Sequence, residues 1–135
     1  MMQEFLLSEE AIFVKKVLTR FATIDLAIVF GSVAKNQATT QSDLDIAISS
    51  LTPLGVEDKI DIINALAQAT GRPIDLVDLR EVGEPLLGQI VQHGKWLIGT
   101  DAQKGALLSQ HLIDAADFSP YRTRILAERQ RAWTL

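Results

Sequence analysis

The sequence predicts an α/β (α+β) fold in which a small mixed sheet is flanked by helices, and three observations support this. Short β-branched runs such as residues 26–30 alternate with longer segments such as residues 56–70, whose apolar residues recur at helical spacing. Gly, Pro and small polar residues mark the boundaries between these segments. An apolar content of 47% with 22% charged residues is typical of a globular chain with a buried core. The alternation of strands and helices therefore favours a sheet with helices packed on it.

The first part of the chain predicts a helix, a strand, a short helix and a polar loop. Residues 8–10, Ser-Glu-Glu, supply a helix cap followed by acidic residues that suit the positive end of the helix dipole. The apolar run at residues 26–30 predicts a buried strand, which Gly31-Ser32 interrupts. Residues 32–35 predict a short helix, and residues 36–42 are small and polar, as in a loop over a ligand.

A second strand over residues 43–48 carries two aspartates at alternate positions. Side chains two residues apart on a strand share a face, so we expect Asp43 and Asp45 to project together. Leu44, Ile46 and Ile48 then line the opposite, apolar face. This strand therefore presents paired carboxylates on one side and core residues on the other.

The rest of the chain predicts further helices and strands in alternation. The helix over residues 56–70 ends at Gly71, and we expect its core face to be formed by Val56, Ile60, Ile63, Leu66 and Ala67. The later elements are a strand at 73–79, a helix at 85–94, an edge strand at 96–98, a helix at 101–118 and a final helix from Ser119-Pro120. We expect one domain over residues 1–135, with the helices of about 101–135 packed on it or on a partner.

The residue types around the aspartate pair indicate a phosphate and metal chemistry. Two carboxylates held close together raise each other's energy unless a cation lies between them. Mg²⁺ prefers such hard oxygen ligands and binds through one or two carboxylates together with substrate phosphates. The Gly31-Ser32 turn offers backbone N–H groups, a hydroxyl and space for a phosphate. Together they predict a site for a metal-bound nucleoside triphosphate.

A third acid could join the pair from the next strand, which carries Asp75 and Asp78. Because these residues are three apart, they point to opposite faces of the strand, and only one can face the paired carboxylates. Spacing alone does not select between the two.

The pattern Gly31-Ser32, ten residues, then Asp43-Leu44-Asp45 resembles the signature of the polymerase-β-like nucleotidyltransferase superfamily. The similarity covers roughly the first hundred residues. It is strongest to the stand-alone minimal nucleotidyltransferases, which include the MntA-type antitoxins that pair with HEPN-domain toxins. Family members often have Arg-Gly after Gly-Ser-x-Ala, where this chain has Lys35-Asn36. Lysine retains the positive charge but not the bidentate geometry of arginine.

This resemblance implies the roles of individual residues. It matches Asp75, in its apolar-Asp-Leu-Val context, to the third catalytic acid, so Asp43, Asp45 and Asp75 are the expected catalytic and metal-binding residues. Gly31, Ser32, Lys35 and Ser42 are the expected nucleotide-binding residues. The implied cofactor is Mg²⁺, with two ions, and the implied substrate is ATP. Neither His93 nor His111 stands in a metal-binding pattern, and we expect each to be a surface or half-buried structural histidine without a functional role.

Three functions remain open for this chain. The resemblance favours transfer of AMP to a hydroxyl, plausibly of a tyrosine, on a partner HEPN-family toxin, because the chain has little room for its own acceptor-binding domain. One alternative is nucleotidyl transfer to a small hydroxylated molecule such as an aminoglycoside. The other is an antitoxin that sequesters its partner by binding alone.

Composition limits the partners and the compartment. The net charge of −4 supplies no general attraction for nucleic acid, and no basic stripe with interleaved aromatics is present, so long nucleic acid is not expected. The absence of cysteine excludes disulfides and thiolate zinc sites and is compatible with a reducing cytosol. The first residues lack a basic signal-peptide region, and no apolar run approaches a membrane span. We therefore expect a cytoplasmic protein without a membrane partner.

Overall fold

The computed structural model describes residues 8–34 and 42–117 and contains a mixed α/β arrangement, as predicted. Its elements in chain order are α1 (Glu9–Thr19), β1 (Ile24–Phe30), α2 (Gly31–Ala34), β2 (Leu44–Ser50), α3 (Val56–Thr70), β3 (Ile74–Asp78), α4 (Leu86–His93), β4 (Lys95–Ile98) and α5 (Asp101–Asp117). The expected final helix from Ser119 lies outside the described residues.

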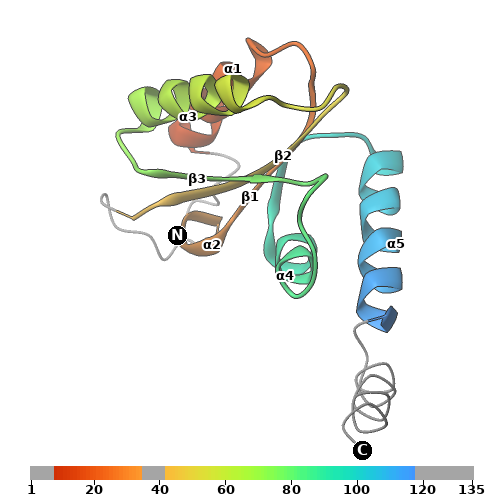
Figure 1. Cartoon of the computed structure of the whole chain (residues 1–135). Coiled ribbons are helices and arrows are strands. Elements are labelled where there is room, and N and C mark those ends of the chain that lie inside the picture. Colours follow the sequence, from red (N-terminus) through yellow and green to blue (C-terminus); the bar gives the residue numbers. More distant parts are fainter. Residues whose placement is uncertain (1–7, 35–41, 118–135) are drawn as a thin grey trace, which may run out of the picture.

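The four strands form one sheet in the order β3-β2-β1-β4. β1 pairs antiparallel with both β2 and β4, whereas β2 and β3 run parallel. The parallel pair is joined through α3, since parallel neighbours need a crossover connection. In Figure 1, α1 and α3 cover one face of the sheet and α4 lies against the other. β3 and β4 are therefore the edge strands.

Two apolar clusters hold the helices to the two faces of the sheet. Leu44, Ile46 and Ile48 are fully buried and pack toward α1 and α3, as the alternation in the sequence predicted. On the other face Ile28 and Ala47 pack against residues of α4 and α5. Because consecutive residues of β2 face opposite layers, Asp45 lies on the same side of the sheet as Ala47 and α4.

α3 meets the sheet through a face that differs from the predicted one. Leu66 is fully buried as expected, but its companion is Ile62, whereas Val56 is 74% and Ile60 49% exposed. Burial at positions 62 and 66 follows the i, i+4 repeat of one helix side, and the first turn extends beyond the sheet. The prediction that Val56 and Ile60 face the core is therefore wrong.

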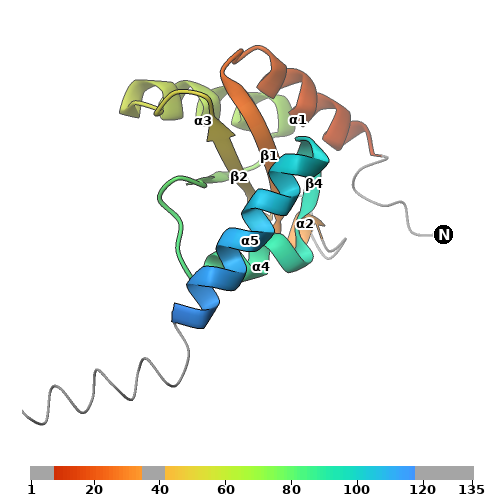
Figure 2. The same ribbon diagram turned by 90° about the vertical axis from the view of Figure 1, so that its right-hand side faces the viewer.

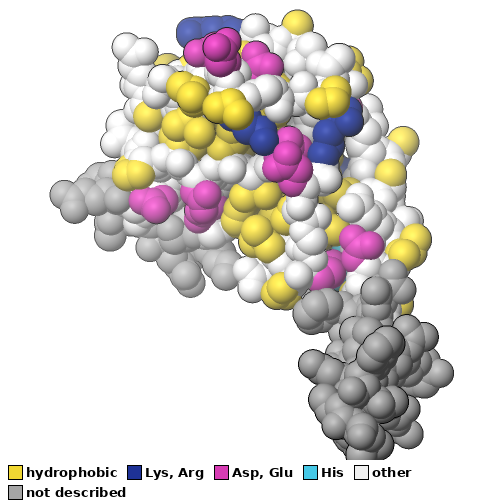
Figure 3. Space-filling view, in the orientation of Figure 1, with side chains coloured by type: hydrophobic (Ala, Val, Ile, Leu, Met, Phe, Trp, Pro, Cys, Tyr) yellow, Lys and Arg dark blue, Asp and Glu magenta, His cyan; other side chains and the backbone are white. Residues whose placement is uncertain are grey.

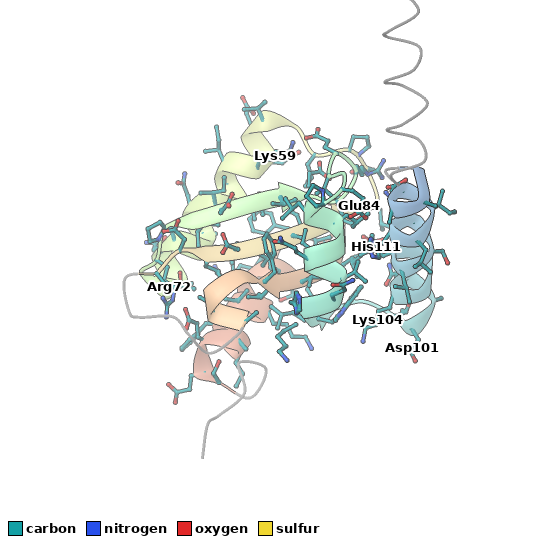
Figure 4. The ribbon with its side chains drawn as sticks, turned by 90° about the horizontal axis from the view of Figure 1, so that it is seen from below. Lys59, Arg72, Glu84, Asp101, Lys104 and His111 are labelled. Atoms are coloured by element: carbon teal, nitrogen blue, oxygen red, sulfur yellow. The ribbon has the colours of Figure 1, made fainter. Side chains whose placement is uncertain are left out.

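α5 packs beside α4, and in Figure 2 it crosses in front of α4 and the sheet. His111 of α5 pairs with Glu84, which precedes α4, and both side chains are largely buried. Gly88 allows this close approach, because a Cβ there would lie 2.8 Å from the His111 ring. Figure 4 shows Glu84 and His111 between the two helices, so the structural role predicted for His111 is confirmed.

None of the helices in the described ranges combines the length and apolar character needed to cross a bilayer. The longest of them, α5, has Asp101, Lys104, Asp114 and Asp117 along its length.

Replacing Leu66 with alanine removes a fully buried side chain between α3 and the sheet. We expect the free energy of unfolding to fall by about 2–5 kcal/mol, from lost apolar burial and the cavity left behind. Leu112→Ala is the matched control, because Leu112 is 61% exposed and its loss should change stability by no more than about 0.5 kcal/mol. Urea unfolding of the two variants measures the difference; equal destabilisation would contradict this packing.

Candidate functional site

The sheet brings Asp45 and Asp75 side by side. Parallel pairing of β2 with β3 puts Asp45 in register with Asp75, and antiparallel pairing of β2 with β1 puts Asp45 opposite Phe30. Neighbouring strands lie about 4.8 Å apart, which lets the two carboxyl groups meet on one face. Asp75 is exposed and Asp45 is partly buried, so the pair opens to solvent on the β3 side.

This arrangement raises the pKa of Asp45 to about 6. Burial is the largest cause, followed by the hydrogen bond with Asp75 and then by the negative charges of Asp75 and Asp43. Two carboxyl groups can hydrogen-bond directly only when one of them holds a proton. A cation between them would remove the need for that proton.

Gly31 closes the site on the β1 side. Its φ of 72° is in the left-handed region, where glycine is favoured, and a Cβ at this position would overlap the Asp45 carboxylate. Glycine therefore serves two purposes, the turn from β1 into α2 and the approach of the backbone to Asp45. Its peptide lies at the aspartate, as the motif predicted.

Ser42 and Asp43 directly precede β2. The strand begins at Leu44, one residue later than predicted. The Leu44 amide donates to the Pro73 carbonyl at 2.8 Å, and this bond joins the entrances of β2 and β3. Asp43 is exposed but close enough for its charge to raise the pKa of Asp45. The three expected acids thus belong to one electrostatic group.

Arg72 fixes the segment that carries Asp43. Its guanidinium donates to the Ser42 carbonyl at 3.0 Å and pairs with Glu10 of α1. Figure 4 shows Arg72 at the end of the sheet remote from α5. The sequence suggested only that Arg72 is a cation that complements a helix end. These contacts could not be predicted, because the partners of Arg72 are 30 and 62 residues away in the chain.

α4 contributes two residues that the sequence did not reveal. A cavity of about 190 Å³ is lined by Phe30, Gly31, Asp45, Gln89 and His93. Gln89 and His93 are four residues apart, so they share a side of α4. His93 is exposed, as predicted for a surface histidine, and it also lines the cavity at Asp45. Its single occurrence beside Gly94 carries no recognisable motif.

Two of the expected nucleotide-binding residues have side chains that the structure does not describe. Lys35 is outside the described residues, and the side chain of Ser32 is likewise not described. Asp78 faces away from the pair: it lies 3.7 Å from the Lys59 ammonium on α3 and accepts the Arg80 amide at 2.9 Å. The structure thus brings Asp75, and not Asp78, to the other two acids.

The donor set suits a hard cation that shares its coordination with a ligand. Among the described residues, no three His, Cys, Asp or Glu side chains converge as a preformed metal cage. Mg²⁺ does not require one, since it keeps several waters and binds one or two carboxylates plus substrate phosphates. The Asp45–Asp75 pair offers oxygen ligands of this kind once a cation takes the place of the proton, so the residues fit the ion.

A larger cavity, of about 600 Å³, lies at the opposite end of the sheet, near α5. Its polar lining includes Asp25, Arg80 and Gln103, with Gln103 donating to Asp25 at 3.1 Å. It holds one carboxylate rather than an adjacent pair, so it lacks the electrostatic feature of the site at Asp45. On the face seen in Figure 3, Lys and Arg side chains lie in small separate groups, which does not form a track for nucleic acid.

The family model and a curated relative both match this chain to nucleotidyltransferases. The family described as "Polymerase beta, Nucleotidyltransferase" matches residues 13–103. The chain is 34% identical over 95 residues to the protein adenylyltransferase MntA of Shewanella oneidensis, a match that covers 66% of this chain and 68% of that protein. The range that the family matches contains the Gly31 turn and all three acids.

Solved structures share this fold. The crystal structure of a toxin-antitoxin with AMP-PNP superposes with a TM-score of 0.76 at 26% identity, over 89% of this chain and 98% of that one. The crystal structure of the toxin-antitoxin MntA-HepT gives a TM-score of 0.71 at 24% identity, over 90% and 97% of the two chains. At the latter identity the likeness establishes the fold only.

Asp45→Asn tests the electrostatic cost of the paired acids. Because the folded-state pKa, about 6, lies above the ordinary 3.8, the folded protein holds this proton longer and loses stability as pH rises between these values. The cost is complete above pH 6 and absent below pH 4. After allowance for solvent screening, we expect Asp45→Asn to be about 1 kcal/mol more stable than wild type at pH 7, with no gain at pH 4.

Urea unfolding at both pH values, without metal or nucleotide, measures this effect. Asp78→Asn is the control, since it breaks the contact with Lys59 and should give no gain at pH 7. A less stable Asp45→Asn at pH 7 would contradict the interpretation.

Proposed function

The chain belongs to the polymerase beta nucleotidyltransferase family, and on this premise we propose that it is an antitoxin that transfers AMP from ATP to a hydroxyl of a partner HEPN-family toxin. The observation that carries the proposal is the Asp45–Asp75 pair, held in register beside the Gly31 turn with Asp43 at its entrance. A pair of carboxyl groups with a perturbed pKa is a feature of functional sites, and a bound cation would offset the repulsion between them.

The acids are proposed as the metal ligands. Asp43 and Asp45 would hold two Mg²⁺ ions, and Asp75 would complete the coordination of the ion on the acceptor side. When bound, these ions neutralise charge on the triphosphate and on the reacting oxygens. Gly31, Ser32, Lys35 and Ser42 are proposed to bind the phosphates, through backbone amides, hydroxyls and the lysine charge.

The reaction is an in-line displacement at the α-phosphorus. The acceptor hydroxyl oxygen forms the new bond to phosphorus, and the bond to the α,β-bridging oxygen breaks, so pyrophosphate leaves. An Asp75 carboxylate oxygen lies on the open side of the site and is the proposed acceptor of the hydroxyl proton. Catalysis then depends on positioning and charge neutralisation more than on covalent chemistry.

Two relatives support the choice of nucleotide and acceptor. One is named a protein adenylyltransferase, and one toxin-antitoxin structure contains AMP-PNP, an ATP analogue. We propose a tyrosine of the toxin as the acceptor and the cytoplasm, where ATP is available, as the compartment. Transfer to a small hydroxylated molecule and inhibition by binding alone are the competing outcomes of the test.

The test mixes the protein with ATP, Mg²⁺ and the candidate toxin and weighs the toxin by mass spectrometry. We expect an increment of one or more AMP units with wild type, and at least a hundredfold slower transfer with Asp45→Asn, because a ligand for the charged phosphates is lost. Asp78 is an acid on the other face of β3, so Asp78→Asn is the matched control and should transfer AMP at close to the wild-type rate.

Other outcomes distinguish the alternatives. A toxin that is bound and inhibited without a change in mass would favour sequestration. A modified aminoglycoside with an unmodified toxin would favour the small-molecule function. Transfer by Asp45→Asn at the wild-type rate would refute the assignment of the acids.

A further inference from the structure

Two α4 residues have side chains whose hydrogen-bonding groups face the site without being used by the fold. Gln89 and His93 are exposed and line the 190 Å³ cavity together with Gly31 and Asp45. Neither side chain makes a hydrogen bond to another described residue. Their N–H groups are therefore available to a ligand, and truncating them leaves the core intact.

The order of the strands decides which part of a ligand meets these residues. β2 lies between β3 and β1, so Asp75 is on one side of Asp45, and Phe30 and Gly31 are on the other. The cavity belongs to the β1 side, since Phe30 and Gly31 line it and α4 packs on β1. Gln89 and His93 thus lie across Asp45 from Asp75.

In-line displacement requires the entering and leaving oxygens to lie on opposite sides of the phosphorus. In the proposed function, Asp75 marks the side of the entering hydroxyl. Pyrophosphate must then depart toward β1, where Gly31 and α4 enclose the cavity. The volume, equivalent to about six waters, suits a diphosphate better than a whole nucleoside.

The chemistry of the α4 side chains agrees with this position. A glutamine amide and an imidazole each supply N–H donors for phosphate oxygens, and neither adds negative charge beside Asp45. His93 is also the last residue of α4. Donors here would strengthen the phosphate site in a chain that has lysine rather than arginine at position 35.

We propose that Gln89 and His93 form the α4 side of a pyrophosphate subsite, which holds the β- and γ-phosphates of ATP and then the leaving pyrophosphate. This inference rests on the proposed function. It adds phosphate contacts from α4 to the phosphate contacts expected at the Gly31 turn.

The test is steady-state toxin modification with ATP varied and pyrophosphate added as product inhibitor. For Gln89→Ala and His93→Ala we expect about tenfold increases in KM for ATP and in the inhibition constant of pyrophosphate, with kcat changed less than threefold, as for one lost hydrogen bond to a charged group. Inhibition by AMP should not change, because AMP lacks these phosphates. His93→Gln keeps an N–H donor and should recover most of the affinity.

Gln92→Ala is the matched control, since Gln92 is an exposed glutamine on α4 that does not line the cavity. Unchanged pyrophosphate inhibition in both Gln89→Ala and His93→Ala, alongside an active wild type, would overturn the subsite and leave the proposed function standing. Equal weakening of AMP and pyrophosphate would also overturn it, by indicating a general distortion. A wild type that neither transfers AMP nor releases pyrophosphate would refute both.

Discussion

The parallel pairing of β2 with β3 forces two carboxyl groups together, and the rest of the site depends on that constraint. Register places Asp45 next to Asp75, while the apolar residues on the other face of β2 are buried against α1 and α3. A one-residue slip would move those apolar side chains out of the core, so the core enforces the contact between the acids. Burial of Asp45, and then its contact with Asp75, raise the pKa of Asp45 to about 6. A pKa shift of this kind is common at functional sites.

Distant segments hold the entrance to this pair in place. Arg72 follows α3 and contacts Glu10 of α1 and the carbonyl of Ser42, so it connects three parts of the chain at the start of β2. With the Leu44–Pro73 backbone bond, this contact determines where Asp43 can lie. Arginine suits the task because its planar fork donates in two directions at once. The position of Asp43 thus depends on tertiary contacts and not on β2 alone.

Local pattern and long-range contact explain which features the sequence could predict. Alternation of Leu44, Ile46 and Ile48 was sufficient for the strand and its buried face, because period two is a property of the strand itself. The choice of Asp75 over Asp78 needed the family resemblance. Their spacing put them on opposite faces of the strand but did not indicate which of them faces Asp43 and Asp45. The helical period of residues 56–70 was clear, yet the sheet covers only its later turns, which left Val56 exposed. Gln89 and His93 could not be found, because α4 reaches the site only through tertiary packing.

The asymmetry of the site bears on what kind of acceptor it can use. β3 is an edge strand, and Asp75 on it is exposed, whereas the opposite side of Asp45 is enclosed by Gly31 and α4. In the proposed reaction the enclosed side takes the phosphates, so the acceptor hydroxyl arrives over the open edge. A hydroxyl on a macromolecular surface can reach an edge, but it could not enter a closed pocket of small volume. A small acceptor would instead need walls to orient it, and the walls of the cavity at Asp45 come from β1 and α4 rather than from β3. This geometry favours a hydroxyl that a partner protein presents and orients.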